Sequence, residues 1–256
     1  MIDSSLWSIL LPALVAGSIV LSTHVLLGRQ VLTRGIIFID LAIAQIAALG
    51  TVVVQLNHEL SHLPYVLWWL PTLFALAGAG LIALLAHYFK QDLEALIGGL
   101  YVIAAVLAVL LLANDPHGSE IIKQLMSGQI LWVSWSQLVL PVLVYTLILI
   151  LLFMLPTLLS GIGFYVIFAI VITISVQLVG VYLVFSSLIF PALAVARQSH
   201  KWSLLYAYII GLLGYFTGLL LSALFDLPSG AMIVMCLAAY AIVYRMVSVI
   251  SIKKQD

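Results

Sequence analysis

The pattern most suggestive of chemistry is H-E-x-x-H, formed by His58, Glu59 and His62. In zinc proteases two histidines at i and i+4 bind zinc from one helical face, and the glutamate activates water. That chemistry needs a stable helix and a third protein ligand. Here the motif fills a short connection between two apolar stretches, with Pro64 two residues beyond His62. We therefore expect a loop that loosely binds or funnels a divalent ion; an intramembrane metalloprotease and a merely solvated loop are the alternatives.

Two ionisable residues lie inside apolar stretches, where a charge is costly and marks a functional residue by default. Asp40 falls about five residues into the second stretch, and His24 precedes Gly28 in the first. If the stretches form a hairpin, His24 and Asp40 sit at similar depth and could pair or share a passing cation. A structural hydrogen bond is the alternative. Gln45 lies about 140° from Asp40 on a helix, so these two cannot hold one ion from a single face. All three are candidates for a transport pathway.

Other chemistry is missing from the sequence. It contains no G-x-x-x-x-G-K-[ST] phosphate loop, so any ATP chemistry must belong to another chain. The single cysteine, Cys236, cannot form a disulfide within the chain. The net charge is zero and no basic tract is present, so nucleic acid is not an expected partner. We expect no bound cofactor and no enzymatic activity in this chain.

The elements that must position these residues are membrane-spanning helices. Hydrophobic residues make up 65% of the 256 residues and charged residues only 7%, so lipid must cover much of the surface. A spanning helix needs about 20 mostly apolar residues. Eight stretches qualify, which predicts an all-α polytopic membrane protein with a single transmembrane domain, residues 1–256. The stretches are residues 6–27, 35–56, 65–87, 95–113, 137–155, 163–185, 203–224 and 229–249.

The sixth stretch is the least regular. Apolar sequence continues from residue 165 to residue 196 and is broken by Gly180 and Pro191. It could hold one helix plus a short bent one. The first stretch has no Lys or Arg before it, so we interpret it as a retained span and not as a secretory signal.

Eight spans place the connections alternately on two sides, and the charges give conflicting orientations. Side one carries three basic residues: Arg29, Arg34 and Lys90. Side two carries six, which by the positive-inside rule would be cytoplasmic: Lys123, Arg197, Lys201, Arg245, Lys253 and Lys254. Side two also carries the histidines and carboxylates that would suit metal capture from outside: His58, Glu59, His62, Asp115, His117, Glu120 and His200.

Several stretches in order along the chain resemble one transporter family. Residues 27–40 running into 44–50, and residues 127–134, 177–194 and 221–230, are similar to the permease subunits of metal-ion ABC importers, which serve zinc, manganese and iron. The resemblance implies a homodimer or pseudo-dimer in the bacterial inner membrane. It also implies cytoplasmic ATPase subunits that use ATP, an extracytoplasmic metal-binding protein, and alternating access at the dimer interface.

Two places depart from the family pattern. The family carries Gly-Asp-Ala-Leu-Ser-His in its second span, where the Asp and His are associated with metal passage. Here Asp40 falls one place early and Gln45 replaces the histidine. The family also has a short helix after the fifth span on which the ATPase docks, whereas this chain has only the turn at residues 155–161. The resemblance makes this turn, and therefore side one, cytoplasmic.

The leading functional hypothesis is the permease subunit of an importer for a divalent metal. Imidazole ligands in external loops suit zinc better than calcium or magnesium, so zinc comes first, with manganese and iron as alternatives. Uptake of a metal chelate or another small solute is a second hypothesis. The metalloprotease built on His58, Glu59 and His62 is the alternative from a different class.

Overall fold

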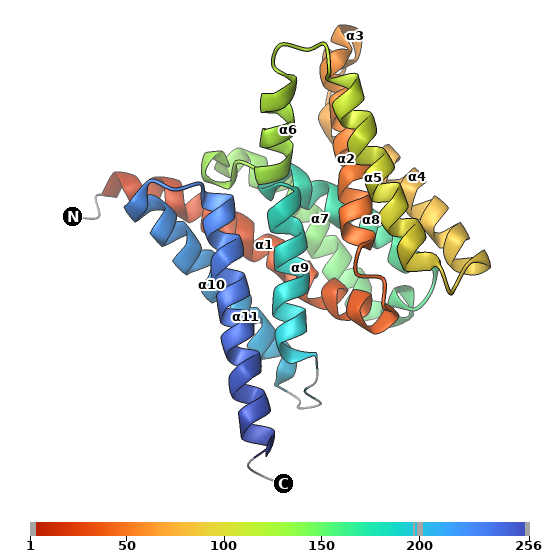
Figure 1. Cartoon of the computed structure of the whole chain (residues 1–256). Coiled ribbons are helices and arrows are strands. Elements are labelled where there is room, and N and C mark those ends of the chain that lie inside the picture. The colour runs from red at the N-terminus through yellow and green to blue at the C-terminus, as the bar shows by residue number, and fades with distance from the viewer. Residues whose placement is uncertain (1–3, 197, 199–201, 254–256) are drawn as a thin grey trace.

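The computed structural model describes residues 4–196, 198 and 202–253; side chains are not described at 4–6, 58, 61 and 249–253. The described residues form helices joined by short turns (Figure 1). They are α1 (Ser4–Arg34), α2 (Ile39–Leu56), α3 (His58–Ser61), α4 (Val66–Tyr88), α5 (Leu93–Leu111), α6 (Gly118–Ser127), η1 (Ile130–Trp132), α7 (Trp135–Met154), η2 (Pro156–Leu159), α8 (Ile162–Val179), α9 (Val181–Val195), α10 (Ser203–Phe225) and α11 (Ser229–Lys253).

The all-α membrane fold is confirmed. Within the described part, 8 helices are long and apolar enough to cross a membrane. They are α1, α2, α4, α5, α7, α8, α10 and α11, one for each predicted stretch. The largest shift in bounds is at α1, which continues to Arg34, where the guanidinium contacts the Leu159 carbonyl oxygen and the Phe164 ring.

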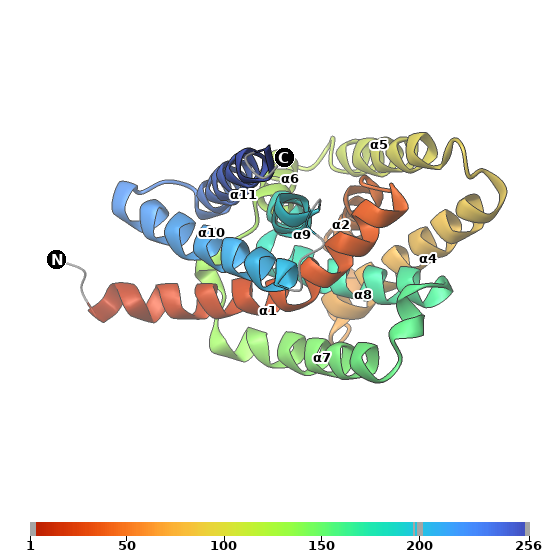
Figure 2. The ribbon, with the colours of Figure 1, turned by 90° about the horizontal axis from the view of Figure 1, so that it is seen from below.

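Burial separates central helices from peripheral ones. In α8, 72% of the spanning window is buried, against 17% in α5. Seen from below, α9 lies end-on near the centre, with α11, α2 and α1 around it (Figure 2). The core therefore forms where α1, α2, α8 and α9 meet, and the outward faces of α5 and α7 are left for lipid.

The sixth stretch holds two helices, as the prediction of one helix plus a short one allowed, and the two form a hairpin. It divides at Gly180 into α8 and the 15-residue α9, which runs back in the opposite direction (Figure 1). Gly180 has φ 80° and ψ 165°, a conformation open almost only to glycine. The backbone of Gly128, which also has positive φ, packs against it. A rule that asks for about 20 apolar residues per span misses α9, because this helix is shorter.

The extra helix reverses the predicted sides of everything after α8. The C-terminal end of α9 lies beside the lower part of α11, where Arg245 donates a hydrogen bond to the Leu193 carbonyl oxygen at 2.5 Å. We call this end of the molecule the basic face; it also carries the α1–α2 turn, the α4–α5 turn and η2 (Figure 1). The opposite face carries α3, the α5–α6 turn and the α10–α11 turn.

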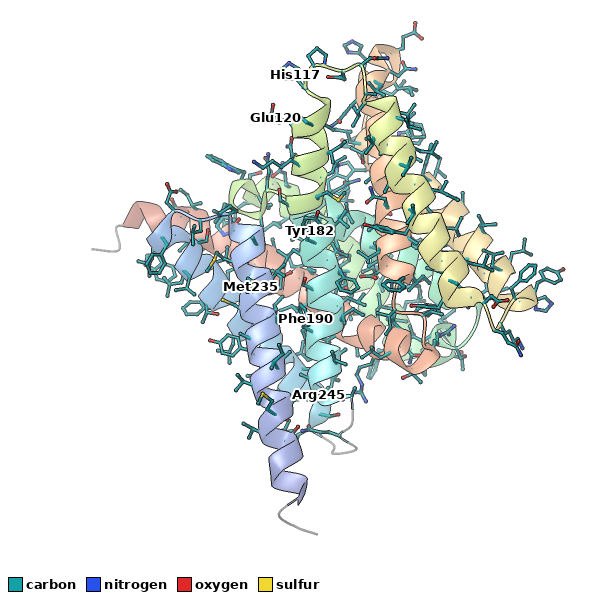
Figure 3. All side chains as sticks on the ribbon, viewed as in Figure 1. His117, Glu120, Tyr182, Phe190, Met235 and Arg245 are labelled. Atoms are coloured by element: carbon teal, nitrogen blue, oxygen red, sulfur yellow. The ribbon has the colours of Figure 1, made fainter. Side chains whose placement is uncertain are left out.

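The described charges now favour one orientation. Arg29, Arg34, Lys90 and Arg245 lie toward the basic face, whereas Lys123 lies toward the opposite face. Figure 3 shows Arg245 on the lower part of α11, and His117 and Glu120 at the top of α6. The predicted side-two positions of Arg245 and Lys253 were wrong, because α11 runs toward the basic face and ends at Lys253. Arg197, His200, Lys201 and Lys254 lie outside the described residues. In the sequence analysis, the side with more basic residues was also the side with the histidines and carboxylates. In the structure most of the described basic residues lie toward the basic face, and those histidines and carboxylates that are described lie toward the opposite face, so this conflict disappears.

Candidate transport pathway

His24 lies deep in the protein, at 0% exposure, and contacts α9. Its Nδ1 is 3.2 Å from the hydroxyl oxygen of Ser187, and that hydroxyl donates to the Val184 carbonyl oxygen at 3.0 Å. A serine hydroxyl has one proton, and when that proton is donated to the Val184 carbonyl oxygen, Ser187 accepts from His24 and Nδ1 carries the hydrogen. In that tautomer Nε2 presents a buried lone pair, and it has no hydrogen-bond partner among the described residues. A lone pair of this kind can bind a metal ion or accept a proton.

Asp40 lies in the first turn of α2 at 1% exposure. Its Oδ1 accepts a hydrogen bond from the Leu41 backbone at 2.8 Å, and Oδ2 has no hydrogen-bond partner in the part of the chain that the structure describes. The helix N-terminus favours a negative charge at this position. Its ionisable neighbour is Glu94 on α5, whose Oε1 accepts from the Phe38 backbone at 3.0 Å. Glu94 was not singled out from the sequence, because it lies near the start of an apolar stretch.

The predicted pairing of His24 with Asp40 is not present in this structure. No hydrogen bond or ion pair joins them in the described part of the chain; His24 bonds to Ser187 and Asp40 to the Leu41 backbone. The hairpin prediction ended the first helix near Gly28. In fact α1 continues to Arg34, ten residues beyond His24, or about 15 Å at 1.5 Å per residue. His24 therefore lies deeper from the basic face than Asp40, the second residue of α2.

Gln45 is also buried, at 5% exposure, and its amide oxygen has no partner. Each residue predicted for the pathway thus carries one buried polar atom without a hydrogen bond. Such atoms are rare in folded proteins, and each one calls for an explanation. A water molecule or a passing ion would satisfy them. Their role in transport stays a prediction.

The outer motif occupies α3, which is a single turn. The Asn57 side chain caps it, accepting from the backbone of Glu59 and Leu60 at 3.1 and 3.2 Å. His62 is the residue that follows the helix, and the side chain of His58 lies outside the described residues. A zinc protease presents this motif on a helix of several turns, and α3 has four residues. Among the described residues, no cluster of three or more His, Cys, Asp or Glu gathers.

A cavity of about 410 Å³, which the sequence analysis missed, opens toward the opposite face. Parts of α2, α4, α6, α7 and α8 and the η1 segment line it. Five of the chain's glutamines contribute side chains: Gln55, Gln124, Gln129, Gln137 and Gln177. Gln55 and Gln137 lie at ends of predicted spans, Gln124 and Gln129 lie in a connection, and Gln177 lies inside the sixth stretch, so the sequence offered no common signal.

Arg34 joins two turns of the basic face. Its guanidinium donates to the Leu159 carbonyl oxygen at 2.6 Å, and its carbon atom Cζ lies 4.2 Å from the centre of the Phe164 ring. One side chain thereby connects the end of α1 with η2 and the start of α8. The sequence indicated only a basic residue near a helix end.

Residues 154–248 match the family described as "ABC 3 transport family". The resemblance to ABC transporter permeases is confirmed. The structure is also similar to a chain in PsaBC from Streptococcus pneumoniae in complex with Fab, with a TM-score of 0.74 and 19% sequence identity. That similarity covers 92% of this chain and 90% of the other, and it shows a shared fold. Comparison with curated proteins returned no match.

The segment that matches the transport family lies in the second half of the chain. It contains α8, the Gly180 turn, α9 with Ser187, α10 and most of α11. His24, Asp40 and Gln45 lie on helices before it. In this chain the matched segment supplies one partner of the His24–Ser187 contact, and the preceding helices supply the buried atoms that lack hydrogen bonds among the described residues.

Proposed function

We propose that this permease is the membrane-spanning subunit of an ABC importer for a divalent metal, with zinc as the first candidate and manganese or iron as alternatives. The family match supports an ABC permease. The observation that carries the metal assignment is the unpartnered Nε2 of His24, at 0% exposure beside α9. Neutral imidazole is a common ligand for zinc and other transition metals.

The basic face is cytoplasmic in this proposal, and a separate ATPase subunit docks there. Its basic residues support that orientation. Apolar side chains project around η2, with Phe153 90% exposed and Ile162 75% exposed. The short η2 turn replaces the longer docking helix of the family, and Arg34 ties it to α1. ATP is used by that subunit, since this chain has no phosphate loop.

Two further partners belong to the proposal. A second copy of this chain completes a homodimeric channel in the bacterial inner membrane, and an extracytoplasmic metal-binding protein delivers the metal to the opposite face. That face carries α3 and His117, which lies 3.8 Å from the Glu120 carboxylate. His58 and His62 loosely hold an arriving ion there.

Uptake by the complex reconstituted in vesicles tests the proposal. Zinc, manganese and iron should be compared, with and without ATP and the ATPase subunit. ATP-dependent accumulation of one of them is expected, and the chain purified alone should hydrolyse no ATP. Accumulation of none of these metals by an active, assembled complex would overturn the metal assignment.

The outer motif separates the transporter from the protease hypothesis. Replacing His58 and His62 by alanine should lower metal capture modestly and leave assembly intact, because both lie in a connection outside the spans. Glu59→Gln should have little effect. Loss of all activity in Glu59→Gln, with metal still bound, would instead indicate general-base catalysis.

A further inference from the structure

The described residues that line the cavity on the opposite face are all uncharged. They include no Asp, Glu, Lys, Arg or His. A free divalent ion entering it would meet no compensating negative charge, and charges that are not paired or coordinated are costly to bury. At about 410 Å³ the cavity is within the size range of pockets for small organic ligands, about 300–1,000 Å³.

Its polar groups suit a ligand that both donates and accepts hydrogen bonds. Each glutamine amide offers two N–H donors and one acceptor oxygen. Two of the five are engaged: Gln177 donates to the Leu67 carbonyl oxygen, and Gln137 accepts from the Ser134 backbone at 2.9 Å. The other three, Gln55, Gln124 and Gln129, make no side-chain hydrogen bond within the described part of the chain. A bare cation could use only their oxygens, whereas an organic ligand could use donors and acceptors alike.

Two tryptophans complete the site. Trp68 and Trp132 both line the cavity, Trp68 half-buried and Trp132 exposed at the rim. Indole rings provide flat apolar area against which the organic part of a ligand can pack. The lining thus combines a few convergent amides with aromatic surface, as is usual for small-molecule pockets.

The cavity also touches the α8–α9 hairpin. Gly128 lines it, and the backbone of Gly128 packs directly on Gly180 at the hairpin tip. Gln177 and Leu178, in the last turn of α8, line it as well. A ligand held there would contact the element whose second helix carries Ser187, the partner of His24.

We propose that this cavity binds an uncharged, hydrogen-bonding small organic molecule at the extracytoplasmic side. This identification of the ligand rests on the proposed importer function. The molecule is then a metal chelate, in which the chelating groups have already neutralised the charge of the metal ion. A metal-free organic solute shares the same chemistry, and the experiment separates the two sources.

Equilibrium dialysis of the purified chain in lipid nanodiscs tests this without the ATPase. The probes are two uncharged complexes, zinc bis-histidinate and tris(acetohydroxamato)iron(III), together with zinc alone and the metal-free ligands. Bound metal is measured by mass spectrometry, and bound ligand by a radiolabel. The pocket variant combines Gln124→Leu and Gln129→Leu, both at exposed positions. The matched control is Gln91→Leu, also exposed but near the basic face.

At least one complex should bind to the wild-type chain and to the control, and its affinity should fall at least tenfold in the pocket variant. Zinc alone should be retained equally by all three. Equal binding of the metal-free ligand would assign the pocket to an organic solute. The proposal is overturned if neither complex binds, if the pocket variant binds both unchanged, or if it loses zinc alone. Binding to the cavity is measured without transport, so a failure of metal uptake in vesicles would not change it. Failure of the cavity proposal can therefore be distinguished from failure of the proposed importer function.

Discussion

Replacing Gly180 by alanine should destabilise the protein by at least about 2 kcal/mol. A non-glycine residue at φ 80° and ψ 165° carries a cost of about 1–3 kcal/mol. The added Cβ would also lie 2.6 Å from the Gly128 Cα and 2.8 Å from the Ser127 carbonyl carbon. These are backbone atoms that cannot rotate away, so the hairpin tip must separate from Gly128, with an overpacking cost of about 1–3 kcal/mol more.

The measurement is thermal unfolding in detergent. For chains of this size about 1 kcal/mol corresponds to roughly 2–4 °C, so the Tm should fall by at least about 4 °C. Gly161 is the matched control because it flanks the other end of α8, and a Cβ there meets nothing within 4 Å. Gly161→Ala should change stability by less than about 0.5 kcal/mol. Equal Tm values for the two variants would refute the argument that the α8–α9 turn requires glycine.

Three further predictions concern other contacts. Asp40→Asn should lower the rate of metal uptake at least tenfold, which corresponds to about 1.4 kcal/mol of activation free energy. Assembly should survive, because the amide still accepts a hydrogen bond. Normal uptake by this variant would remove Asp40 from the pathway. Arg34→Gln should lower the free energy of unfolding by about 1–3 kcal/mol, because a charged hydrogen bond and the contact with the Phe164 ring are lost. Thermal unfolding measures this change, and an unchanged Tm would contradict a stabilising role for Arg34. Tyr145→Phe should lower the free energy of unfolding by about 1 kcal/mol in the same assay, because the buried Tyr145 hydroxyl is hydrogen-bonded to Ser175 at 2.5 Å. A loss of uptake without a loss of stability would instead give Tyr145 a functional role.

The spans could be predicted from the sequence because hydrocarbon imposes a simple requirement. Backbone groups in lipid must be satisfied within the segment, so long apolar stretches have to be helices. Burial of His24, Asp40 and Gln45 was foreseeable on related grounds, since polar residues in apolar stretches turn away from lipid. These predictions depend on local composition, which one sequence shows directly.

The remaining features depend on contacts between distant segments. The reversal at Gly180 could not be inferred, because an isolated glycine is compatible with a kink, a bend or a turn until its backbone angles are known. The Ser187 partner of His24 lies 163 residues away in the sequence. The glutamine-lined cavity draws on six separate helical segments, none of which has a distinctive pattern of its own.

The added helix α9 also bears on how such chains could be joined. Because the described chain crosses from the opposite face at α1 to the basic face at the end of α11, two copies cannot be linked head to tail by a short tether. The end of the first copy and the start of the second would lie on different sides of the bilayer, about 30 Å of hydrocarbon apart. A direct fusion of two described segments would therefore need one more membrane-crossing segment between them.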